Sequence, residues 1–252
     1  MKFICETNQR ESAILAAKIV ADLIREKPDA TLGLATGSSP VDVYHELVKM
    51  YRNKEVSFHK IKTLNLDEYV SLSADHEQSY AYFMRKHLFD KIDIQKENTH
   101  IPNGVAPDLK EECLRYDGII ESVGRVDLQI LGIGHNGHIA FNEPSDSFST
   151  STSLVSLTPS TVKANSRFFK PHESPPTWAI TMGIGSILKA KRIILLAFGE
   201  GKARALERAL FGPITPTLPA SALQLYSGEL TVCTDPAAFS EIKNKIKKGL
   251  SH

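Results

Sequence analysis

The sequence has few cysteines, no long apolar run and no excess of charge of either sign. Its three cysteines, Cys5, Cys113 and Cys233, are far apart and form no CxxC pair, so neither a disulfide framework nor a thiolate zinc site is indicated. Lysine and arginine number 30 against 29 aspartate and glutamate residues, which argues against a nucleic-acid surface or a polybasic membrane patch. No secretory pattern opens the chain, and no stretch approaches the roughly 18 apolar residues of a membrane helix. We therefore expect a cytoplasmic protein with reduced thiols that binds neither nucleic acid nor a membrane.

The sequence does contain enough apolar residues for a large core, in short runs that alternate with helical patterns. The apolar share is 42 % of 252 residues, and we expect one domain over residues 1–252. Buried strands are predicted at 31–35, 61–66, 126–132 and 192–198. Helices are predicted at 11–27, 40–52, 76–89, 107–124, 183–190, 201–211 and 236–249. This alternation indicates an α/β fold with a mostly parallel sheet and helices on both faces, whose ligands bind at the carboxyl ends of the strands.

A turn rich in hydroxyl groups, Thr36-Gly37-Ser38-Ser39-Pro40, follows the first of these strands. Ser39 is a good N-cap for the next helix, and Pro40 suits the first helical position. Gly37 lets the backbone approach a ligand closely, and the free N–H groups of a helix N-terminus favour an anion. The GxxxxGK[ST] spacing of a Walker A loop is absent. The turn is therefore either a phosphate site or an ordinary capped turn.

Two cationic residues are candidates for the same phosphate. Lys202 opens a helix just after the strand at 192–198, at the carboxyl edge of the predicted sheet. Arg167 lies between aromatic and polar residues in ANSRFF, and a guanidinium group suits planar, bidentate recognition of phosphate. Taken alone, each residue has a simpler interpretation: Lys202 as a solvated lysine and Arg167 as one partner of a surface ion pair.

Acid–base residues follow two of the predicted strands. Asp67 and Glu68 are adjacent, so their side chains point in different directions and only one is expected to enter a cleft. The block GIGHNGHIAFNEP (132–144) places three glycines within six residues, which indicates close approach of backbone to a ligand. In this block His138 and Glu143 suit a general base with its orienting carboxylate. A metal site built from His135, His138 and Glu143, or a polar loop with a buried histidine, are the alternatives.

Taken together and in this order, these motifs resemble the glucosamine-6-phosphate deaminase family over nearly the whole chain. The resemblance rests on LATGSSP (34–40), LNLDEYV (64–70), GIGHNGHIAFNEP (132–144), ANSRFF (164–169), TMGIG (181–185), GxxKARAL (199–206) and PASALQLY (219–226). It implies a three-layer α/β/α Rossmann-like open sheet. It also implies the conversion of glucosamine 6-phosphate and water to fructose 6-phosphate and ammonia, in N-acetylglucosamine catabolism, with no cofactor and no metal.

Carried over residue by residue, the resemblance assigns roles to four acid–base residues. Asp67 is expected to take the C2 proton of the open-chain sugar and to return it to C1. His138 is expected to open the pyranose ring, oriented by Glu143. Asn136 stands where many relatives carry an aspartate that assists this histidine. The substrate phosphate is expected at Thr36, Gly37, Ser38, Ser39, Arg167 and Lys202.

The resemblance also bears on regulation and assembly. Ser153 and Val155 occupy positions at which activated relatives carry basic residues, and the segment from Asp146 to Ser156 contains no lysine or arginine. We therefore expect no activation by N-acetylglucosamine 6-phosphate. The C-terminus is also shorter than in the activated hexameric relatives, so we expect a monomer or small homo-oligomer. A candidate mobile lid is expected at residues 158–177. The sequence leaves four alternatives open: a galactosamine-6-phosphate deaminase, a 6-phosphogluconolactonase-like enzyme, a metal-dependent hydrolase and a non-catalytic sugar-phosphate sensor.

Overall fold

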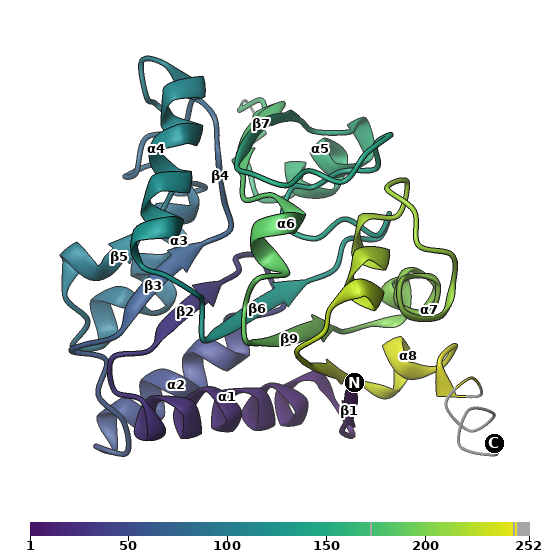
Figure 1. Cartoon of the computed structure of the whole chain (residues 1–252), viewed down its shortest axis with the longest axis horizontal. Helices are drawn as coiled ribbons and strands as arrows, with labels where there is room; N and C mark the ends of the chain where they lie inside the picture. The colour runs from purple at the N-terminus through teal and green to yellow at the C-terminus, as the bar shows by residue number, and fades with distance from the viewer. Residues whose placement is uncertain (172, 244, 246–252) are drawn as a thin grey trace.

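A seven-stranded parallel sheet forms the centre of the molecule (Figure 1). The computed structural model describes residues 1–171, 173–243 and 245. In the order of the sheet, the strands are β1 (Lys2–Cys5), β10 (Glu229–Thr234), β9 (Arg192–Ala197), β6 (Leu128–Gly132), β2 (Thr31–Leu34), β3 (Lys62–Asn65) and β5 (Thr99–His100). Every neighbouring pair is parallel. The four strands predicted from the sequence are confirmed as β2, β3, β6 and β9, whereas the sequence pattern does not predict β1, β5 or β10.

A second, smaller sheet is antiparallel, in the order β4 (Asp67–Tyr69), β8 (Trp178–Thr181), β7 (Ser153–Ser156). The chain passes from the large sheet to the small one at Leu66, between β3 and β4. The Leu66 N–H donates to the Leu34 carbonyl of β2 at 3.2 Å, and the Leu66 carbonyl accepts from the N–H of Met182 at 2.7 Å. One residue is therefore hydrogen-bonded to both sheets.

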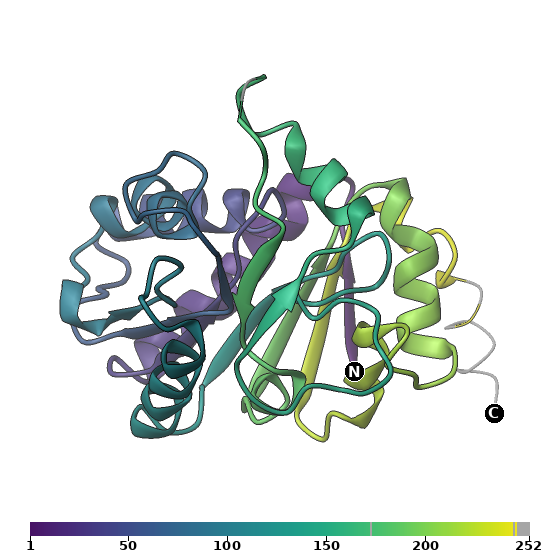
Figure 2. The ribbon, with the colours of Figure 1, turned by 90° about the horizontal axis from the view of Figure 1, so that it is seen from above.

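Helices cover both faces of the large sheet. They are α1 (Gln9–Glu26), α2 (Val41–Arg52), α3 (Tyr80–His87), α4 (Leu109–Ser122), α5 (Pro159–Ser166), α6 (Ile184–Ile187), α7 (Ala203–Phe211) and α8 (Pro236–Phe239). Figures 1 and 2 show α1 and α2 side by side on one face, with α4 and α6 on the other. This layering confirms the predicted fold class. The helix predicted at 236–249 begins as α8, and positions 244 and 246–249 lie outside the described residues.

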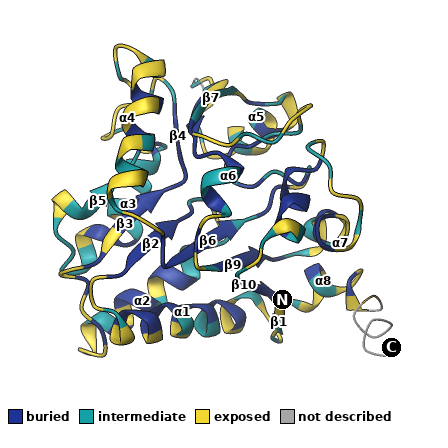
Figure 3. Ribbon diagram, viewed as in Figure 1, coloured by how far each residue is buried: buried dark blue, intermediate teal, exposed yellow. Residues whose placement is uncertain are grey.

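Local sequence explains the long helix α1. The Asn8 side chain accepts the N–H of Glu11 at 3.0 Å, which satisfies one of the free donors of the first turn. Along the helix a wide face of small and branched apolar residues is buried, among them Ala13, Ala17 and Val20. The strands between the two edges of the sheet are buried almost throughout, so the core lies between the sheet and its helices (Figure 3). Among the helices of the described residues, none combines the length and the apolar character needed to cross a bilayer.

The strand order reverses next to β2. From β2 the chain moves outward to β3 and β5, and then returns to β6 on the other side of β2. The loops that follow β2 and β6 therefore leave the same edge of the sheet side by side and diverge, which opens a crevice between them.

Candidate active site

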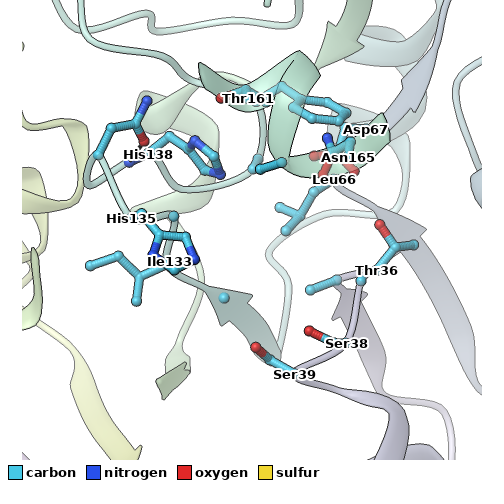
Figure 4. Close-up of a pocket in the computed structure, with 18 of the residues that line it drawn as sticks. Thr36, Ser38, Ser39, Leu66, Asp67, Ile133, His135, His138, Thr161 and Asn165 are labelled. Carbon is cyan, nitrogen blue, oxygen red and sulfur yellow. Dashed lines mark hydrogen bonds between the residues drawn. The ribbon is translucent and has the colours of Figure 1, made fainter. Parts of the chain in front are cut away.

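A cavity of about 380 Å³ lies at this crevice (Figure 4). The loops after β2, β3 and β6, together with α5 and the short helix η3 (Glu200–Lys202), form its walls. Every site residue predicted from the sequence lines it except Glu143. Figure 4 shows His138 and Asp67 at one end of the cavity and the side chains of Ser38 and Ser39 at the other. The topology thus joins groups that are far apart in the sequence.

The hydroxyl-rich turn after β2 forms one end of the cavity. Gly37 has a φ of 90°, and a Cβ atom there would meet nothing within 4 Å, so backbone conformation rather than space requires glycine. The prediction that Ser39 is the N-cap of α2 is wrong. Pro40 takes that position, because its carbonyl already accepts the N–H of Tyr44 at 3.0 Å. The Ser39 side chain lies one residue too early to cap the helix and lines the cavity instead.

The adjacent carboxylates of β4 point in opposite directions, as the alternation of a strand requires. Asp67, which is 5 % exposed, lines the cavity. Glu68 lies on the other side of the strand and accepts backbone N–H groups from Tyr69, Tyr80 and Ala81 at 2.8, 2.8 and 2.9 Å. The prediction that only one of the pair enters the cleft is confirmed, and Glu68 fixes the start of α3 behind it.

Burial changes the acidity of both carboxyl groups. It raises the pKa of Asp67 well above its ordinary value, the nearby charge of Glu68 adds to this rise, and the backbone N–H of Phe141 opposes it. Burial also raises the pKa of Glu68, to about 7, although its three backbone hydrogen bonds lower it in part. A carboxylate with a raised pKa is a stronger base, which suits Asp67 for taking up a proton from a carbon atom.

Behind His138, at the edge of the cavity, lies the buried side chain of Glu143. The distance from His138 Nδ1 to Glu143 Oε2 is 3.6 Å, longer than a direct hydrogen bond. Asn136 donates from Nδ2 to the same Oε2 atom at 2.7 Å, and its Oδ1 accepts the backbone N–H of His138 at 3.2 Å. Asn136 therefore holds the carboxylate and the backbone of the histidine, and makes no hydrogen bond to the imidazole ring.

The Glu143 carboxylate stays ionised in this setting. Burial alone would raise its pKa, but the His138 ring, with smaller contributions from Thr161 and Asn136, outweighs burial and lowers the pKa. A charged carboxylate next to Nδ1 favours the tautomer that carries its proton on Nδ1, which leaves Nε2 free to accept a proton in the cavity.

Arg167 and Lys202 bring positive charge to the cavity from two elements. Arg167 follows the last residue of α5, and its guanidinium carbon lies 4.7 Å from the centre of the Phe168 ring. Burial and, to a lesser extent, the charge of Arg167 lower the pKa of Lys202 to about 8. The two cations thus repel one another in a partly desolvated place. An anion bound between them would offset this repulsion.

Sequence reasoning missed a group of polar and aromatic side chains that connect α5 with β4 and α3. Asn165 donates from Nδ2 to the Tyr69 hydroxyl at 2.8 Å. The rings of Tyr69 and Tyr80 are 4.9 Å apart, and the Tyr80 hydroxyl faces Thr36 in the phosphate turn. Asn165 and Tyr80 also line the cavity. Asn165 lies in the ANSRFF motif quoted above, but only the folded chain shows that it bonds to Tyr69.

The metal hypothesis gains no support from donor geometry. His135 and His138 line the cavity, but Glu143 lies behind His138. Over residues 1–171, 173–243 and 245 there is no group of three or more His, Cys, Asp or Glu side chains placed to hold a metal ion.

Comparison with known proteins agrees with this geometry. The model of the family described as glucosamine-6-phosphate isomerases/6-phosphogluconolactonase matches residues 9–232. The chain belongs to this family. It is therefore an enzyme of carbohydrate metabolism, as the sequence motifs indicate.

Members of the family resemble this chain at two levels. The glucosamine-6-phosphate deaminase of Thermoanaerobacter sp. (strain X514) is 51 % identical over 245 residues, covering 97 % of this chain and 96 % of that protein. The deaminase of Clostridium perfringens (strain SM101 / Type A) is 48 % identical over 238 residues, covering 94 % and 98 %. The structure of a monomeric glucosamine-6-phosphate deaminase superposes with a TM-score of 0.92 at 46 % identity, covering 96 % and 100 %. A 6-phosphogluconolactonase from Trypanosoma cruzi has a TM-score of 0.75 at 19 % identity, over 96 % and 97 %, and shares the fold alone.

Proposed function

We propose that this protein is a glucosamine-6-phosphate deaminase, which converts glucosamine 6-phosphate and water to fructose 6-phosphate and ammonia. One observation carries the proposal. A single cavity has a buried carboxylate, Asp67, and a histidine, His138, at one end and a hydroxyl-lined turn at the other. Glu143 lies behind His138, with its Oε2 atom 3.6 Å from Nδ1 of the ring. The deaminases that resemble this chain at about half of all positions support the same reaction.

The phosphate end of the cavity would hold the substrate. The backbone N–H groups of the turn at Gly37, the hydroxyls of Thr36, Ser38 and Ser39, and the cations Arg167 and Lys202 would bind the phosphate. A phosphate fixed there places the sugar along the cavity, with its reacting carbons towards Asp67. Holding the substrate in one orientation makes the later proton transfers intramolecular.

At the other end, His138 would open the pyranose ring by moving a proton between the C1 hydroxyl and the ring oxygen. Glu143 would keep the imidazole in the required tautomer, and Asn136 would hold Glu143 in place. The product of this step is the open-chain amino aldehyde. Ring opening and deprotonation thus fall to different residues.

Asp67 would then remove the C2 proton, giving an enolamine, and return it to C1. The nitrogen-bearing C2 becomes a ketimine, to which water adds, and ammonia leaves as the C2 carbonyl of fructose 6-phosphate forms. Besides proton transfers, the sequence therefore breaks the bond from C1 to the ring oxygen, adds water at C2 and breaks the C2–N bond as ammonia leaves. The raised pKa of Asp67 suits a group that both takes and returns a proton.

The same proposal covers segments and properties beyond the reacting groups. Residues 158–177 would act as a lid, since α5 and the residues after it carry Thr161, Asn165, Arg167 and the 46 % exposed Phe168 on the cavity wall; position 172 lies outside the described residues. We further propose a single domain, a cytoplasmic monomer or small oligomer, and no activation by N-acetylglucosamine 6-phosphate. The absence of lysine and arginine between Asp146 and Ser156 supports the last point.

The test is a stoichiometric assay of the purified protein after treatment with EDTA. Incubation with glucosamine 6-phosphate should release ammonia and fructose 6-phosphate in equal amounts. Galactosamine 6-phosphate and 6-phosphogluconolactone, assayed in parallel, distinguish the two related enzymes. Turnover of the lactone without release of ammonia, or activity abolished by the chelator and restored by a metal ion, would contradict the proposal.

A further inference from the structure

His135 lies in the cavity beside the proposed phosphate site, and the mechanism above gives it no role. It stands in a tight turn whose ends are pinned, because the Gly137 N–H donates to the Gly134 carbonyl at 3.1 Å and the Gly134 N–H donates to the His138 carbonyl at 2.8 Å. Figure 4 shows the ring of His135 inside the cavity, below His138. The turn therefore presents this side chain to the ligand in a defined position.

The ring is packed against the backbone of η3, the element that carries Lys202. A Cβ atom added to Gly201 would come within 2.8 Å of Cε1 and 3.0 Å of Nδ1 of His135. Glycine at 201 thus leaves the space that the imidazole ring occupies. This contact places the ring next to Lys202 along the chain, on the side of the cavity away from Asp67.

The groups that face His135 are cationic or neutral. They are Lys202 on η3, His138 on the same loop and Arg167 after α5, together with the backbone of Gly201. Burial, followed by the charges of Lys202, His138 and Arg167, lowers the pKa of His135, and only the Gly201 backbone acts in the opposite direction. Without a ligand the imidazole is therefore neutral at neutral pH, in a place where a phosphate dianion would reverse the balance of charge.

We infer that His135 is a further ligand of the substrate phosphate and takes up a proton when the phosphate binds. The inference takes the identity of the sugar from the proposed function. The binding of a phosphate at His135 does not depend on that function. A neutral imidazole donates one hydrogen bond, and the imidazolium form donates from both nitrogens and adds a charge. Affinity for the phosphate should therefore rise as the pH falls towards 6, until the phosphate itself becomes protonated.

The experiment measures binding of inorganic phosphate by titration calorimetry near pH 7, in two buffers that differ in ionisation enthalpy. His135→Asn should weaken binding about 3- to 10-fold, between the values of an exposed ion pair and of a charged hydrogen bond, and should reduce the proton uptake. Gly201→Ala, which displaces the ring, should weaken binding in the wild-type background and have little effect in the His135→Asn background. His59→Asn, an exposed histidine outside the cavity, is the matched control.

Unchanged phosphate affinity and unchanged proton uptake in a folded His135→Asn variant would overturn the inference. Equal effects of Gly201→Ala in both backgrounds would also overturn it, because the substitution would then weaken phosphate binding without acting through the His135 ring. Binding of phosphate requires no turnover. A protein that released no ammonia but lost phosphate affinity on His135→Asn would refute the proposed function and uphold this inference.

Discussion

The two ends of the cavity differ in burial and in charge. At the acid–base end Asp67 and the Glu143 side chain are 5 % and 7 % exposed, and Asn136 holds Glu143 through a hydrogen bond. At the phosphate end Ser38 and Arg167 are exposed, and positive charge dominates. Under the proposed function, the buried end would control reactivity through geometry and desolvation, and the open end would attract the phosphate through charge. Substitutions at the two ends should therefore change different kinetic constants.

The largest effect is expected for Asp67→Asn. The amide keeps the shape of the side chain but cannot take the C2 proton, so kcat should fall about 10²- to 10⁴-fold. Affinity for inorganic phosphate, measured by calorimetry, should stay close to that of the wild type. Asp29→Asn, an exposed carboxylate that precedes the amino end of β2 and does not line the cavity, is the control. A loss of phosphate affinity that parallels the loss of kcat would show that the two ends are not separable.

Arg167→Ala tests the opposite end. Loss of a charged, bidentate contact should raise KM about 10- to 100-fold and leave kcat within a few-fold of the wild type. The measurement is initial-rate kinetics of ammonia release, with Arg52→Ala at an exposed helix end as the control. A selective loss of kcat would instead place Arg167 at the reacting carbons.

Lys202 should make KM depend on pH. Its pKa of about 8 lies below the ordinary value for lysine, so the free enzyme loses this charge as the pH rises through 8. Phosphate binding must then restore the proton, and KM should rise by up to about tenfold per pH unit above that point. In Lys202→Arg the group stays charged, so the rise should disappear. The same rise in both proteins would assign it to another group.

The smallest effect concerns the link between α5 and β4. Tyr69→Phe removes the acceptor of the Asn165 hydrogen bond, which should cost about 0.5–1.5 kcal/mol in the free energy of unfolding. A double-mutant cycle with Asn165→Ala, followed by urea denaturation, isolates the pair. Additive losses would show that the bond contributes nothing to holding α5 over the cavity.

The sequence predicts the centre of the sheet better than its margins. The strands β2, β3, β6 and β9 contain short apolar runs and are largely buried, so they are visible locally. The edge strand β1 is only half-buried, and β10 mixes threonines with apolar residues. The small sheet pairs β4 with β8 about a hundred residues later. A local sequence pattern cannot predict a pairing between segments so far apart in the chain.

The site shows the same limit at the level of single residues. The motifs place Asp67, His138 and Lys202 at one cavity, because all three follow strands of one parallel sheet. They do not show that Asn136 bonds to Glu143 rather than to the imidazole, or that Pro40 replaces Ser39 at the helix start. These details depend on side-chain directions, which sequence spacing does not determine.

The single-residue connection at Leu66 has a consequence for how this chain can vary. Since Leu66 is bonded on both sides to different sheets, deletion or insertion of one residue here would shift the phase of β4 by one step. Such a shift would exchange Asp67 and Glu68, pointing the longer side chain into the cavity and removing the carboxylate that fixes the start of α3. A shift of one residue would thus replace the carboxylate that lines the cavity with the one that lies behind it. The length of this connection, and not only its buried side chain, therefore decides which carboxylate lines the cavity.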